Sequence, residues 1–178
     1  AISVSFGGHE VLPHFLVPLK QLLSVPVPAD PAQDTTGAWL RVESGILALG
    51  CIADGCPQIV GYLDELYPML LTWASHARPL IRKIALWCMS RYSEWLIRVS
   101  SKSAAEAQRY LAPVVQCFCA RMCDHTKAVQ GSAVSALGVL QDGTRVFSTF
   151  PCQFDMRNLL NIPQRPNNYM GVKVGQDK

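Results

Sequence analysis

Residues 38–98 decide the fold, and they read AWLRVESGILALGCIADGC, then PQIVGYLDELYPMLLTWASHA, then RPLIRKIALWCMSRYSEWLIR. Apolar residues recur at helical spacing in each of the three segments, which predicts three successive helices. The first and third helices overlay without a gap, residues 42–50 on residues 82–90, and small residues coincide at Gly45 and Ala85. The shift from residue 42 to residue 82 is 40 residues, a period that is typical of arrays of stacked helical pairs.

The same pattern continues on both sides of this stretch. Residues 130–138 (QGSAVSALG) overlay the two earlier segments, with Ala133 as their small residue. Helices are predicted over residues 10–24, 39–56, 58–74, 80–97, 104–123 and 126–140. They alternate between the first (A) and the second (B) helix of a pair. We therefore expect an all-α HEAT-repeat solenoid segment of about three helix pairs.

The solenoid segment is predicted to span residues 1–143, with a Pro-rich loop inserted at residues 25–37. Residues 144–178 contain scattered Pro, Gly and Asn without an apolar period, so an irregular or disordered tail is expected there. The chain starts with Ala1 instead of Met, and the repeat pattern stops without a further A helix. We expect a fragment or a truncated product of a longer array.

Composition and charge limit the classes of partner. A hydrophobic content of 49% with 16% charged residues is typical of a folded, helix-rich body. Residues 1–143 carry eleven Lys or Arg and eleven Asp or Glu, so the net charge of +3 comes from the tail. A neutral body offers no electrostatic basis for binding nucleic acid. No apolar run is long enough to span a membrane, and no signal peptide is recognisable.

The chain offers little for catalysis or for metal binding. Its seven cysteines are odd in number and lie mostly in apolar helical patterns, which favours free thiols in a reducing compartment. Cys117, Cys119, Cys123 and His125 have a spacing that resembles a zinc site. On a helix, however, Cys117 and Cys119 point about 200° apart, so we expect no metal and no cofactor. No catalytic or phosphate-binding motif occurs, so an enzyme is not expected.

The B-helix segments carry a more specific likeness. The segments 43–56 (ESGILALGCIADGC), 62–71 (YLDELYPMLL) and 81–95 (IRKIALWCMSRYSEW) resemble the central repeats of transportin, the karyopherin-β2 type of nuclear import receptor of the importin β family. The segment 12–23 (LPHFLVPLKQLL) resembles the A helix that begins this section. The W-x-x-S-R-Y-x-x-W pattern across Trp87–Trp95 is the most specific part of a resemblance that covers roughly residues 9–140.

The resemblance implies a cargo-binding site on the concave B-helix face, which in this family receives the proline-tyrosine part of a nuclear localisation signal. Carried over by position, the contacts are Leu47, Ile84, Trp87 and Arg91. The last three follow an i, i+3, i+7 spacing and so form one stripe on a helix. Leu47 is the repeat equivalent of Trp87. An apolar pocket with Arg91 at its rim suits Pro and Tyr rings, with the guanidinium donating to backbone carbonyls or to a carboxylate.

The resemblance also implies partners and a location. Cargo proteins would bind here, whereas the Ran GTPase and nucleoporins would bind repeats outside this chain, and the receptor would work in both cytoplasm and nucleus. Two departures from the family pattern are the missing acidic residue on a preceding B helix and the long loop 25–37. A HEAT-repeat scaffold subunit that organises an enzyme complex, such as a phosphatase, remains the alternative, as does a product too short to bind anything.

Overall fold

The computed structural model describes residues 8–28 and 30–146, and every regular element in these ranges is helical. The α-helices are α2 (Gly8–Leu23), α3 (Ala38–Cys51), α4 (Leu63–Trp73), α5 (Pro79–Arg91), α6 (Ser93–Ser100), α7 (Ala104–Glu106), α8 (Ala112–Met122) and α9 (Lys127–Val146). The prediction of an all-α HEAT-repeat solenoid segment is confirmed. Residues 147–178 of the predicted tail lie outside the described residues.

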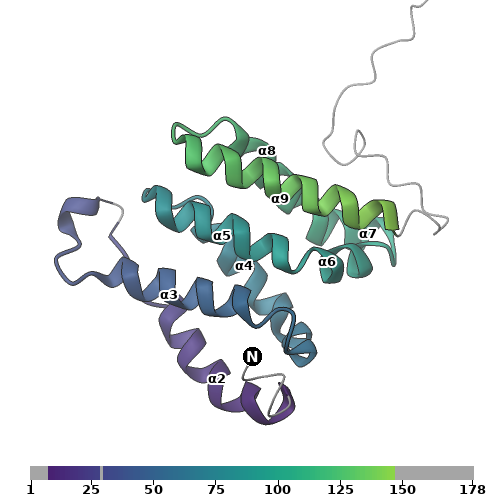
Figure 1. The fold of residues 1–178 in the computed structure, drawn as a ribbon, viewed down its shortest axis with the longest axis horizontal. Helices are drawn as coiled ribbons and strands as arrows, with labels where there is room; N and C mark the ends of the chain where they lie inside the picture. The colour runs from purple at the N-terminus through teal and green to yellow at the C-terminus, as the bar shows by residue number, and fades with distance from the viewer. Residues whose placement is uncertain (1–7, 29, 147–178) are drawn as a thin grey trace, which may run out of the picture.

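The helices form two layers (Figure 1). The B helices α3, α5 and α9 lie side by side in one layer, α3 against α5 and α5 against α9. The A helices α4 and α8 lie in the second layer, behind α5 and α9 respectively, and α2 packs on α3. This arrangement follows from the repeat, because each pair buries one face internally and another against the next pair.

A small residue allows two of the helices to approach closely. A Cβ atom added at Gly45 would lie 2.9 Å from the Cβ of Leu22, so α2 and α3 can meet at this distance only with glycine at position 45. The equivalent residues Ala85 and Ala133 are fully buried in α5 and α9. All three coinciding small residues thus lie at or next to buried helix contacts.

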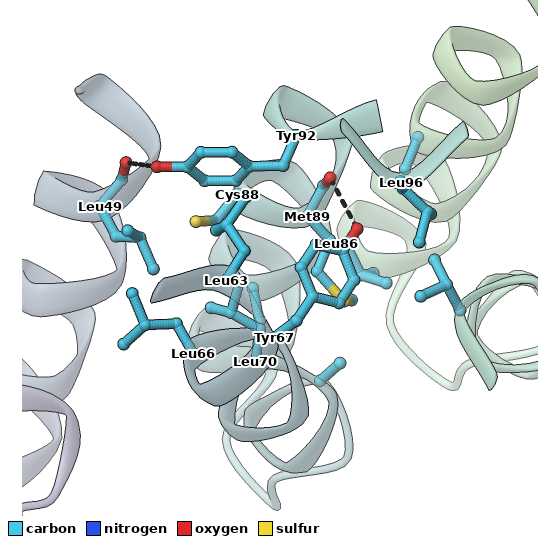
Figure 2. Close-up of a cluster of buried hydrophobic side chains, with 14 of the residues drawn as sticks. Leu49, Leu63, Leu66, Tyr67, Leu70, Leu86, Cys88, Met89, Tyr92 and Leu96 are labelled. Carbon is cyan, nitrogen blue, oxygen red and sulfur yellow. Dashed lines mark hydrogen bonds between the residues drawn. The ribbon is translucent and has the colours of Figure 1, made fainter. Parts of the chain in front are cut away.

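A continuous apolar core lies between the layers. Figure 2 shows its central part, where Leu63, Leu66 and Leu70 of α4 gather against Leu86 and Met89 of α5. All five side chains are fully buried. Each such side chain contributes roughly 1.5–3 kcal/mol to folding when it leaves water.

One predicted helix is wrong, because residues 80–97 do not form a single B helix. The chain leaves helical geometry at Tyr92, with φ −104° and ψ 16°, which separates α5 from α6. Tyr92 is buried, and its hydroxyl donates to the carbonyl of Leu49 on α3 at 2.6 Å (Figure 2). The hydroxyl of Tyr67 donates at 3.0 Å to the carbonyl of Met89, which also accepts from the N–H of Tyr92 at 3.2 Å. These buried tyrosine bonds tie the break between α5 and α6 to α3 and α4.

The A helices also begin less regularly than predicted. Residues Pro57–Tyr62 form a 3-10 helix before α4, and a π-helical turn over Ala107–Leu111 joins α7 to α8. The π turn lies just before Pro113, which has no N–H to donate to the preceding turn, so the hydrogen-bond ladder shifts there. At the start of this segment the Ser103 hydroxyl accepts from the N–H of Glu106 at 3.1 Å and so caps the helix.

A buried ion pair joins the start of α5 to the turn before α9. The guanidinium of Arg82 donates twice to the carboxylate of Asp124, at 2.8 and 2.7 Å, and also to the carbonyls of His76 and Ala77. The carboxylate accepts in addition from the N–H of Thr126 at 3.0 Å, which satisfies a free donor at the start of α9. The Asp124 side chain is 2% exposed, so the pair is shielded from solvent. It locks one repeat to the next.

The stability of the fold should depend on pH through Asp124. The hydrogen bonds from Arg82 hold the pKa of Asp124 down at about 2, below its ordinary value of 3.8. Because the pKa is lower in the folded than in the unfolded state, the contribution of Asp124 to stability is fully present above about pH 4 and is lost as pH falls towards about 2. We expect the urea midpoint to fall over this range, and to fall less steeply in Asp124→Asn. Parallel curves for the two proteins would contradict this assignment.

Candidate binding face

The predicted contact residues come from two neighbouring B helices. Leu47 lies on α3, and Ile84, Trp87 and Arg91 follow one another along α5. Because α3 and α5 pack against each other, the structure brings all four residues to the same pair of helices. We call the side of α3 and α5 that carries these four residues the B face.

Trp87 is the best-fixed member of the B face. Its ring packs directly on Gly50 of α3, where an added Cβ would lie 2.3 Å from Cζ3 and 2.8 Å from Cη2. The indole is half-buried, so part of it lies against the core and part remains open to solvent. The absence of a side chain at Gly50 thus allows the ring to approach α3 this closely.

Leu47 and Ile84 flank the tryptophan. Leu47 precedes Gly50 by three residues on α3, and its side chain is 45% exposed although it is apolar. Ile84 precedes Trp87 by three residues on α5 and is half-buried against the core. The two apolar side chains and the indole offer a ligand a surface that water solvates poorly.

Arg91 lies one turn after Trp87 and has an ion-pair partner. Its guanidinium pairs with the carboxylate of Asp54, which follows the end of α3. The two side chains are 38% and 75% exposed, so this ion pair lies at the surface. The sequence analysis placed Arg91 at the rim but did not give it an acidic partner in this chain.

The alignment of α5 against α3 is fixed next to this pair. The buried hydroxyl of Tyr92, just after α5, donates to the carbonyl of Leu49 on α3 and so links the two helices. Within α5 the hydroxyl of Ser90 donates to the carbonyl of Trp87 at 2.7 Å. The bond from Tyr92 helps to hold α5, which carries Trp87 and Arg91, in place against α3.

Gly50 and Asp54 were not predicted as part of this face, although their spacing carries a signal. Leu47, Gly50 and Asp54 repeat the i, i+3, i+7 spacing of the stripe on α5. The two stripes can therefore be paired position by position, Gly50 under Trp87 and Asp54 beside Arg91. Other exposed apolar residues of the B helices were not predicted as contacts either; they are Leu40, Leu80, Val134 and Val139.

The described residues hold no group of three or more His, Cys, Asp or Glu side chains placed to bind a metal ion. Cys117 and Cys119 are half-buried and Cys123 is exposed, all as free thiols. Desolvation raises the pKa of Cys117, which keeps it protonated at neutral pH. Within residues 8–28 and 30–146, each helix is too short or too polar to cross a membrane.

Comparison with known proteins gives a consistent result. No family model matches the chain. Transportin-1 of Homo sapiens and of Mus musculus are each 37% identical over 134 residues, which is 75% of this chain. Importin subunit beta-2 of Schizosaccharomyces pombe is 35% identical over 124 residues, or 69% of this chain. The chain spans 13% of the length of each of these relatives.

The resemblance that the sequence predicted is thereby confirmed, and so is the stacking of helix pairs on which it depends. Transportin of Dictyostelium discoideum is also similar, with 34% identity over 71% of this chain. In the part that these proteins share with it, this chain belongs to the transportin, or importin β-2, family of karyopherins.

Proposed function

We propose that this chain forms part of a nuclear import receptor and that its B face binds the proline-tyrosine segment of a nuclear localisation signal. The observation that carries the proposal is the Trp87 ring, held on Gly50 and half open to solvent on a surface with exposed Leu47. An aromatic ring fixed in this way stacks well on Pro and Tyr rings, because it loses little conformational entropy on binding. Membership of the transportin family supports the same reading.

The proposal extends to partners and location. Cargo proteins that carry such signals would bind through an extended segment, without a cofactor and without chemistry. The Ran GTPase and nucleoporins would act at other repeats of the receptor, and the receptor would move between cytoplasm and nucleus. These steps rest on the family, whose named members include importin subunit beta-2.

Replacing Trp87 with alanine tests the proposal. Fluorescence anisotropy would follow the binding of a labelled peptide that contains basic residues and a Pro-Tyr pair. We expect Trp87→Ala to weaken binding by more than about tenfold, or about 1.4 kcal/mol, because the central aromatic anchor is lost. Circular dichroism checks that the variant remains helical.

Two further variants make the result specific. Leu47→Ala removes a 45% exposed side chain and should weaken binding with no loss of helicity. Val60→Ala removes a similarly exposed apolar side chain, 39% exposed, from the 3-10 helix before α4 and should leave binding unchanged. A folded protein that binds the peptide equally well with and without Trp87 and Leu47 would rule out this face.

A further inference from the structure

The ion pair between Arg91 and Asp54 leaves the rim of the B face without net charge. Arg91 is the cation that the proposed function aims at the ligand, and Asp54 already holds its guanidinium. The pair joins α5 to the turn after α3, beside the contact between Trp87 and Gly50. Any ligand group that reaches Arg91 therefore meets the charge of Asp54 as well.

Stability does not explain this pair. Both side chains are exposed, 38% and 75%, and exposed ion pairs contribute little to folding because solvent screens them and their side chains lose entropy. The helices it joins are already fixed by the buried Tyr92 hydroxyl on the Leu49 carbonyl. A role in ligand selection is therefore the more economical reading of Asp54.

The chemistry of the pair decides what Arg91 can bind. A guanidinium has five N–H donors, and one carboxylate takes up at most two of them in a bidentate contact. The remaining donors can still bond neutral carbonyl oxygens. A second carboxylate would gain attraction from Arg91 but suffer repulsion from Asp54, so its charge brings little net advantage.

We propose that Asp54 sets the specificity of the B face: by neutralising Arg91 it makes the face accept an uncharged backbone segment of the ligand without favouring a chain terminus that ends in a carboxylate. This inference rests on the proposed function. Of the two roles that the sequence left open for Arg91, donating to backbone carbonyls or to a carboxylate, the pairing with Asp54 favours the first. An internal Pro-Tyr segment followed by more chain should therefore bind as well as one that ends the chain.

The test uses the whole chain and two fluorescein-labelled peptides. Both have the same basic residues and end in Pro-Tyr; one ends in a carboxylate and the other in an amide. The measured quantity is the ratio of the amide Kd to the carboxylate Kd. We expect a ratio near one for the wild type, and about threefold to tenfold preference for the carboxylate in Asp54→Asn, where Arg91 is unpaired.

Two controls separate this effect from a general change in charge. Glu94→Gln breaks the exposed Arg98–Glu94 pair on α6 and changes the net charge equally, so its ratio should match the wild type. Adding Arg91→Gln to Asp54→Asn should return the ratio to near one. Thermal unfolding of Asp54→Asn should be unchanged, because the pair is exposed.

The outcomes are distinguishable. Binding that depends on Trp87, together with the same ratio in Asp54→Asn as in the wild type, would overturn the role of Asp54 and leave the proposed function intact. A wild type that already prefers the carboxylate severalfold would overturn it too. Failure of both peptides to bind any folded variant would overturn the proposed function and this inference together.

Discussion

Asp124→Ala should lower the free energy of unfolding by about 3–5 kcal/mol, the expected cost of leaving one member of a buried ion pair without its partner. The Arg82 side chain is 9% exposed, so its charge would stay poorly solvated. Its remaining hydrogen-bond acceptors would be the carbonyls of His76 and Ala77. The substitution also leaves the N–H of Thr126 at the start of α9 without its acceptor. Both losses act on the junction between the second and third helix pairs.

Urea unfolding followed by circular dichroism measures this effect. Glu94→Ala is the matched control, because it breaks an Arg–carboxylate pair of 2.5 Å whose side chains are 62% and 69% exposed, and it should cost less than about 1 kcal/mol. The double variant Arg82→Met, Asp124→Leu should recover much of the loss, since it removes both charges. Equal destabilisation by Asp124→Ala and Glu94→Ala would mean that the inner pair is not shielded from water.

Gly50→Ala should impair both folding and peptide binding, although alanine is the better helix former. The new Cβ would lie 2.3 Å from Cζ3 of Trp87, so the ring has to move off α3. We expect a loss of about 1–3 kcal/mol from this overpacking. Because the ring also presents the proposed binding surface, peptide affinity should fall roughly as far as in Trp87→Ala, by about tenfold.

The chain supplies a close control at Gly138. This glycine occupies the same position of the repeat on α9, where an added Cβ would meet nothing within 4 Å. Gly138→Ala should therefore stabilise the protein by about 0.5–1 kcal/mol, the usual gain from replacing glycine inside a helix. Thermal unfolding and anisotropy on both variants give the comparison. Similar effects at the two positions would show that Trp87 does not press on Gly50 as described.

The sequence was sufficient for the repeat and for its layers. The gapless overlay of residues 42–50 on 82–90 identified equivalent B helices, and α3 and α5 do lie side by side. Local breaks were harder to predict. The apolar spacing runs through Tyr92 without interruption, yet the helix ends there, where the tyrosine hydroxyl bonds a carbonyl 43 residues away in the sequence. Periodicity describes one helix at a time and does not register such a bond.

The same limit applies to the candidate face. The spacing of Ile84, Trp87 and Arg91 on one helix could be read from the sequence, and the structure puts Leu47 on the adjoining helix. The contact of Trp87 with Gly50 and the pairing of Arg91 with Asp54 depend on how α3 and α5 are aligned. That alignment is set by buried tertiary contacts, so it could be recognised only in three dimensions.

The polar links between helices have a consequence for how the chain folds. Lys20–Glu65, Arg78–Asp34, Arg82–Asp124 and Tyr92–Leu49 each join neighbouring pairs, and the hydrogen bonds among them span 42 to 45 residues. Among the described residues, these long-range links stop at the adjacent pair. Folding can then start at any helix pair and propagate from each pair to the next, so that cooperativity acts mainly between neighbouring pairs. Such a chain should tolerate the insertion or removal of a whole repeat far better than a shift of a few residues within one.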